Sequence, residues 1–233
     1  MNRRFVLLVL TLAGLAAGPA RAQQPTPAEF IDGCLAALLD VPPASLPTRH
    51  VFRLVRPGDT TARVDVELAG ARLVHLSCPG YGVDPDPATG APRLSTPDGS
   101  AGRLLTYSEI ANLRSFLSLD PYWVFRRIGA EIDAYAFTPD EAGGVMIVRR
   151  ESRVPLADPG EKVYGHFREE AVIGLAGQDL VSYSVMALDE DRIAVRDILN
   201  LYEYERTRGP AWVRVTQGSN FSAAGPRVYR VNY

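Results

Sequence analysis

The sequence predicts an α+β protein in which one large, curved antiparallel β-sheet of about nine or ten strands packs on two amphipathic helices. Two helix-start motifs stand before apolar residues at helical spacing. Most of the second half consists of β-branched and aromatic runs. Short turns separate these runs, so neighbouring strands should be antiparallel.

The N-terminus has the residue order of a secretory signal peptide. Arg3 and Arg4 precede an apolar run at 5–17, and small residues around 20–22 predict cleavage after Ala22. No cysteine follows closely enough to carry a lipid anchor, and no later stretch reaches the roughly 18 apolar residues of a spanning helix. We therefore expect a periplasmic or secreted protein with one α+β domain at 23–233 and no integral membrane segment after cleavage.

The first helix should begin after Thr26. This residue is a candidate N-cap, Pro27 suits the first helical position, and Glu29 completes a capping box. The stripe that follows ends at Asp40, before two prolines. Its apolar residues are Phe30, Ile31, Cys34, Leu35, Leu38 and Leu39.

The second helix should run from about Tyr107 to Leu119. Thr106 and Glu109 form another capping box, and Asp120-Pro121 is expected to stop the helix.

Strand signals fill most of the remaining chain. Apolar and charged residues alternate from Thr61 to Leu68, as in a half-buried strand. The other predicted strands are 51–56, 72–77, 131–137, 145–154, 163–175, 180–188, 192–206, 212–217 and 227–233. Residues 79–102 are rich in proline and glycine and predict a long exposed loop inside the domain.

This arrangement resembles, in layout alone, the lipoprotein carriers of the periplasm and the helix-grip lipid-binding domains. The resemblance implies a sheet wrapped over helices around an apolar space. Function drawn from layout is analogy, because one fold hosts many functions.

Cys34 and Cys78 are the only two cysteines. An even count in an exported chain predicts one disulfide between them, tying the first helix to a strand.

The sequence assigns no catalytic residue, metal ligand or cofactor site. His50, His75 and His166 stand in no metal-binding or general-base spacing. His166 shares a strand face with Arg168 and Glu170, which would suit acid–base chemistry, although a solvated polar face fits the same pattern.

The charge pattern bears on two further classes of partner. Asp84, Asp86 and Asp98 place carboxylates in the 79–102 segment, a weak calcium signal without a third closely spaced ligand. The net charge of −2 and the lack of basic runs argue against nucleic acid.

Large rings on the late strands are the remaining candidates for a site. We expect Tyr183, Tyr202, Tyr204 and Trp212 to line a ligand space. The sequence thus favours an exported protein without catalytic activity that binds an apolar or lipid-like molecule or an envelope component. An envelope protein–protein interaction module, a hydrolase and a small outer-membrane β-barrel stay open as alternatives.

Overall fold

The computed structural model describes residues 25–56, 59–78, 81–95, 101–153, 166–188, 194–206, 212–219 and 227–233. The predicted signal peptide at 1–22 lies outside these residues. Within the described ranges, no helix has both the length and the apolar character needed to cross a membrane.

The described residues form thirteen strands in one antiparallel sheet, with the order β6-β5-β4-β3-β2-β1-β13-β12-β11-β10-β9-β8-β7. The predicted α+β class is confirmed. The first six strands are β1 (Arg49–Arg56), β2 (Asp59–Ala69), β3 (Arg72–Cys78), β4 (Tyr81–Pro85), β5 (Pro92–Ser95) and β6 (Ala101–Leu104). The others are β7 (Ala136–Pro139), β8 (Val145–Arg153), β9 (His166–Gly174), β10 (Asp179–Leu188), β11 (Ala194–Arg206), β12 (Trp212–Ser219) and β13 (Arg227–Asn232).

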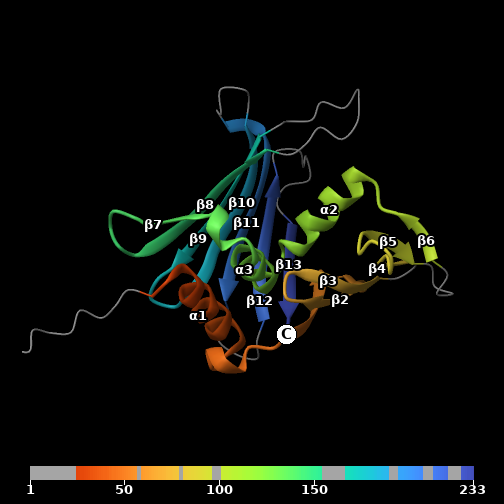
Figure 1. Cartoon of the computed structure of the whole chain (residues 1–233), viewed down its shortest axis with the longest axis horizontal. Coiled ribbons are helices and arrows are strands. Elements are labelled where there is room, and N and C mark those ends of the chain that lie inside the picture. The colour runs from red at the N-terminus through yellow and green to blue at the C-terminus, as the bar shows by residue number, and fades with distance from the viewer. Residues whose placement is uncertain are drawn as a thin grey trace, which may run out of the picture.

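The sheet has two wings that meet at one short junction. β1 pairs with β13 only over residues 53–55 and 230–232, whereas β1 and β2 pair along almost their whole length. In Figure 1, β10–β13 lie behind α2 and α3, β7 projects to the left of the helices, and β2–β6 lie to the right, below α2.

Three α-helices are present among the described residues: α1 (Pro27–Leu39), α2 (Tyr107–Leu117) and α3 (Pro121–Ala130). Short 3-10 turns follow α1 at η1 (Pro43–Ser45) and α3 at η2 (Ile132–Ala134). Both predicted capping boxes are confirmed: the Thr26 and Thr106 side chains accept the Glu29 and Glu109 backbone N–H groups.

The third helix was not predicted. Asp120-Pro121 ends α2 as expected, but it also starts α3, because the Asp120 side chain accepts the backbone N–H of Tyr122 and proline suits the first helical turn. After α3, the predicted strand at 131–137 is partly wrong, since η2 intervenes and β7 begins only at Ala136.

The prediction of a long unpaired loop at 79–102 is also wrong. This segment contributes β4 and β5 and the start of β6, which account for the strands beyond the predicted nine or ten. Pro85 and Pro92 face each other at the ends of β4 and β5, where a missing N–H costs little. Between them the Asp86 carboxylate accepts the backbone N–H groups of Ala88 and Thr89, which builds the turn.

The main core lies where α1 and α3 pack on the sheet. Buried side chains of α3 include Tyr122, Trp123, Phe125 and Ile128, and α1 contributes Ile31 and Leu35. A Cβ at Gly129 would lie 3.5 Å from Cγ2 of Ile31, so the two helices are in close contact.

The predicted disulfide is wrong: among the described residues, no bridge joins Cys34 and Cys78. Cys34 is buried on α1, and the charge of Asp179 on β10 contributes to raising the pKa of its thiol. Cys78 ends β3 and pairs with Tyr81 of β4. Cys34 thus belongs to a helix and Cys78 to a strand end.

Cys34 should be almost unreactive in the folded protein. Burial, with the Asp179 charge adding to it, raises the pKa of the Cys34 thiol to about 12, so very little thiolate forms at neutral pH. In a Cys78→Ser variant we expect alkylation of native protein to be about three orders of magnitude slower than alkylation in urea. Mass spectrometry over time measures both rates, and equal rates would contradict this burial.

Candidate functional site

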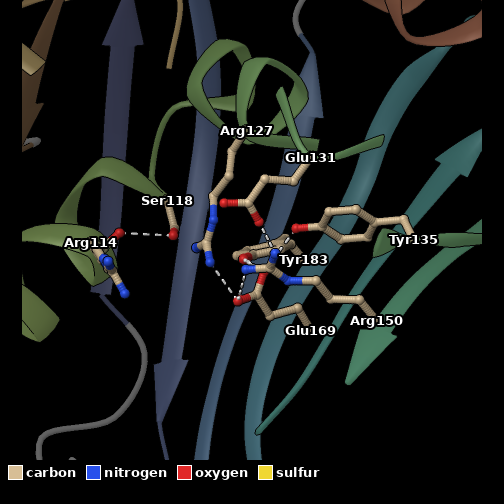
Figure 2. Close-up of polar contacts among 8 residues, drawn as sticks. All are labelled: Arg114, Ser118, Arg127, Glu131, Tyr135, Arg150, Glu169 and Tyr183. Carbon is tan, nitrogen blue, oxygen red and sulfur yellow. Dashed lines mark hydrogen bonds and ion pairs between the residues drawn. The ribbon is translucent and has the colours of Figure 1, made fainter. Parts of the chain in front are cut away.

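A buried carboxylate lies beneath α3 at the centre of a polar network. Glu169 of β9 is only 5% exposed and is in phase with the buried Ala171 and Ile173 on the same strand. Figure 2 shows its side chain meeting residues from α3, from the segment after α3 and from the two neighbouring strands.

Both oxygens of Glu169 receive two hydrogen bonds. Nη2 of Arg127 on α3 and Nη2 of Arg150 on β8 lie 2.6 Å and 3.0 Å from Oε1. The hydroxyls of Tyr135 and Tyr183 donate to Oε2 at 3.0 Å and 3.1 Å. The carboxylate is therefore fully satisfied, as a buried charge must be.

The network holds Glu169 ionised. Burial acts to raise the pKa of Glu169, but Arg127 and Arg150 outweigh it and the pKa is lowered. Burial, with the Glu169 charge adding to it, raises the pKa of Tyr135 and of Tyr183, so both hydroxyls keep the protons that they donate.

The Arg150 guanidinium has N–H donors that do not bond Glu169. One guanidinium nitrogen, Nη1, contacts Glu131 at the end of α3, and the guanidinium lies over the Tyr135 ring at 5.0 Å from its centroid. Its Nε is buried and has no hydrogen-bond partner among the described residues.

The predicted ligand-lining tyrosines lie under α2 and α3, with their hydroxyls turned toward the helices. Tyr202 on β11 donates to the Ser115 carbonyl at 2.9 Å, and Tyr204 donates to the Ser118 carbonyl. Tyr183 on β10 donates to Glu169. Trp212 begins β12, but its side chain lies outside the described residues.

A second buried cluster stands at the start of α3. Nε2 of His50 on β1 lies 4.0 Å from Oδ2 of Asp120, and neither atom has a hydrogen-bond partner within the described part of the chain. The Tyr233 hydroxyl donates to the other Asp120 oxygen at 2.8 Å, and the His50 ring stacks on Tyr122.

Burial moves both pKa values of this cluster toward the uncharged forms. It raises the pKa of Asp120 to about 7. It lowers the pKa of His50 to about 4, with the charge of Arg126 acting in the same direction.

The other polar residues singled out from sequence are dispersed. Near His166, Arg168 bonds Glu151 and Glu170 bonds Arg149, which is the cross-strand pairing of a solvated face. The described ranges contain no group of three or more histidine, cysteine or acidic residues arranged to hold a metal.

Two of the three carboxylates of the weak calcium signal contact other side chains of the protein. Asp84 lies 2.6 Å from Nδ1 of His75, and Asp86 pairs with Arg93 at 3.0 Å. Asp98 lies outside the described residues.

Residues 105–135 form a helical strap, by which we mean α2, α3 and η2 together. The strap leaves β6 at one edge of the sheet and enters β7 at the other edge. Between these edges it contacts β9, β11 and the end of the chain through Glu169, the tyrosine hydroxyls and Tyr233. Its first residue, Leu105, donates its backbone N–H to the Pro92 carbonyl of β5 at 3.0 Å, and beyond that residue the strap crosses the sheet without strand pairing.

Sequence reasoning found the tyrosines but missed Glu169, Arg127 and Arg150. A signal for Glu169 was present, because it occupies an inward position of a strand whose next inward residues are Ala171 and Ile173. Arg127 had no such signal, since the helix that carries it was not predicted.

The chain matches no protein-family model, no curated protein and no solved structure.

Proposed function

We propose that this protein is an exported, non-catalytic binding protein that takes up an apolar or lipid-like ligand between the helical strap and the sheet. The observation that carries the proposal is the course of the strap, which joins the two sheet edges across one face and makes no strand pairing there. Such a segment can move away from the sheet without breaking the sheet itself.

The inner surface of the strap suits an apolar chain. Trp123, Val124, Phe125 and Ile128 of α3 are buried in the same core as Tyr183, Tyr202, Val148 and Ile173 of the sheet. An acyl chain placed between these layers would keep both apolar surfaces away from water, which limits the cost of lifting the strap.

Polar contacts at separate points would fix the closed position. Tyr202 and Tyr204 bind carbonyl groups of the strap, and the Arg127–Glu169 ion pair joins α3 to β9. Each contact is specific in geometry, so closure returns the strap to one position.

Trp123 provides a direct test of where a ligand binds. The chain has two tryptophans, so a Trp212→Phe variant leaves Trp123 of α3 as the single source of tryptophan fluorescence. A lysophospholipid with a brominated acyl chain should quench most of the Trp123 emission, because bromine quenches at contact range. The unbrominated lipid should leave the intensity within about a tenth of its starting value.

A Trp123→Phe variant, which retains Trp212, is the matched control and shows whether quenching is specific to the strap. Native mass spectrometry reports binding independently. Bound lipid without quenching of Trp123, or no bound lipid at all, would contradict the proposal.

A further inference from the structure

Four charged groups between the strap and the sheet form two matched pairs. The sheet supplies Glu169 and Arg150, which stand directly opposite each other on β9 and β8. The strap supplies Arg127 and Glu131, four residues apart at the end of α3. Figure 2 shows all four side chains in one cluster.

The contacts between the pairs are crossed. Arg127 of the strap bonds Glu169 at 2.6 Å, and Glu131 of the strap contacts Arg150. The strap therefore presents one cation and one anion to a sheet pair of the opposite arrangement.

The sheet pair would stay assembled if the strap moved away. Arg150 lies 3.0 Å from Glu169, and the Tyr183 hydroxyl on β10 holds the other carboxylate oxygen. Departure of Arg127 would leave one position on Glu169 open to a cationic donor. Departure of Glu131 would leave Nη1 of Arg150 open to an anion, next to the buried Nε that already has no partner in the described chain.

We infer that Glu169 and Arg150 recognise the zwitterionic headgroup of an amphiphile, with an ammonium group replacing Arg127 and a phosphate replacing Glu131. This inference rests on the proposed function, because the headgroup reaches the pair only when its acyl chain lies under the strap.

Charge balance selects this class of headgroup. Glu169 and Arg150 together carry no net charge, so a headgroup with only a negative charge would stand beside Glu169 without compensation. A purely cationic headgroup would meet Arg150 in the same way. A zwitterion matches both charges, and mismatch in a partly buried site is costly.

The test compares lysophospholipids with one acyl chain and different headgroups, using quenching of Trp123 in competition with the brominated lipid. We expect the phosphoethanolamine lipid to bind about tenfold more tightly than the phosphoglycerol lipid. Glycerophosphoethanolamine, which has the same zwitterionic phosphodiester headgroup but lacks the chain, should not compete at the same concentrations.

Two variants test the residues. In an Arg150→Gln/Glu169→Gln double variant the tenfold preference should disappear. Glu131→Gln removes the strap anion at an exposed position and should tighten binding of the phosphoethanolamine lipid several-fold, since Arg150 is then less occupied. Asp133→Asn, which removes an exposed carboxylate from the neighbouring η2 turn, should leave the affinity unchanged.

The outcomes separate this inference from the proposed function. Equal binding of all headgroups, or unchanged affinity in Glu131→Gln, would overturn the headgroup assignment and leave binding under the strap intact. Failure of every amphiphile to bind would overturn the proposed function, and the headgroup assignment with it.

Discussion

Replacement of Glu169 by leucine is expected to lower the free energy of unfolding by about 3–5 kcal/mol, because it leaves two buried guanidinium groups without their shared carboxylate. Arg127 and Arg150 both bond Oε1 of Glu169, and their side chains are 16% and 11% exposed. Tyr135 and Tyr183 would lose the acceptor of their hydroxyls in the same change. Urea unfolding followed by circular dichroism measures the difference.

Glu170 offers a matched control on the same strand. It faces the opposite side of the sheet and pairs with Arg149, whose side chain is about half exposed. Glu170→Leu should cost about 1 kcal/mol or less, as is usual for ion pairs near the surface. Similar losses for the two variants would show that the network under α3 does not hold the strap.

A double variant separates the charge from the packing. In Arg127→Met/Glu169→Leu, fewer buried charges lack a partner, so the loss should be smaller than for Glu169→Leu alone. A larger loss would mean that the shape of the two side chains, and not their charge, stabilises the contact between α3 and β9.

Local motifs made much of the secondary structure predictable. The capping boxes at Thr26 and Thr106 use only neighbours three residues away, so their geometry is contained in the sequence. Most strands after residue 145 follow from β-branched runs separated by short turns. These signals are local, and they are sufficient to predict the α+β class.

The predictions of secondary structure were wrong where one residue pattern is compatible with two different structures. Asp120-Pro121 ends one helix and begins another, and the prediction from sequence included only the first role. Proline and glycine at 79–102 mark turns and strand ends as well as loops. Here Gly90 takes a positive φ of 72° in the turn between β4 and β5.

The candidate site was only half predictable for a different reason. Tyr183, Tyr202 and Tyr204 could be named because aromatic residues on strands are visible in sequence. The hydroxyl partners of Tyr202 and Tyr204 come from the strap, 87 and 86 residues earlier in the chain, and depend on how α2 lies across the sheet. Only the topology brings these groups together.

The second large effect is expected on the pH dependence of stability, at His50 and Asp120. Their pKa values shift in opposite directions, so their contributions to this pH dependence should nearly cancel in the wild-type protein. Burial raises the pKa of Asp120 from 3.8 to about 7, so the unfolded chain ionises first and stability falls as pH rises from about 4 to about 7. Burial lowers the pKa of His50 from 6.5 to about 4, so stability falls as pH drops from about 6.5 to about 4.

Within the described ranges, no group around the pair provides a counter-charge for Asp120 at hydrogen-bond distance. Tyr233 donates to Asp120, Tyr122 stacks on His50, and the Asp120 charge acts on Tyr204 of β11. The charge of Arg126 reaches His50, but its guanidinium bonds the Tyr122 hydroxyl and the Pro47 carbonyl. The neutral pair is therefore the favoured state between about pH 4 and 6.5.

Single substitutions should expose one slope each. Asp120→Asn, which retains a capping side chain, should make the protein lose stability on acidification from pH 6.5 to pH 4. His50→Phe, which retains a stacking ring, should make it lose stability as pH rises from 4 to 7. Each slope can reach about 1.4 kcal/mol per pH unit relative to wild type, the limit for one titrating group.

Urea midpoints at pH 4, 5, 6, 7 and 8 measure these profiles, and subtraction of the wild-type profile removes the contribution of other groups. The double variant should return close to the wild-type profile, because both titrating groups are gone. Parallel slopes in the two single variants would contradict opposite titration, and with it the burial of an uncharged His50–Asp120 pair at the joint between α2 and α3.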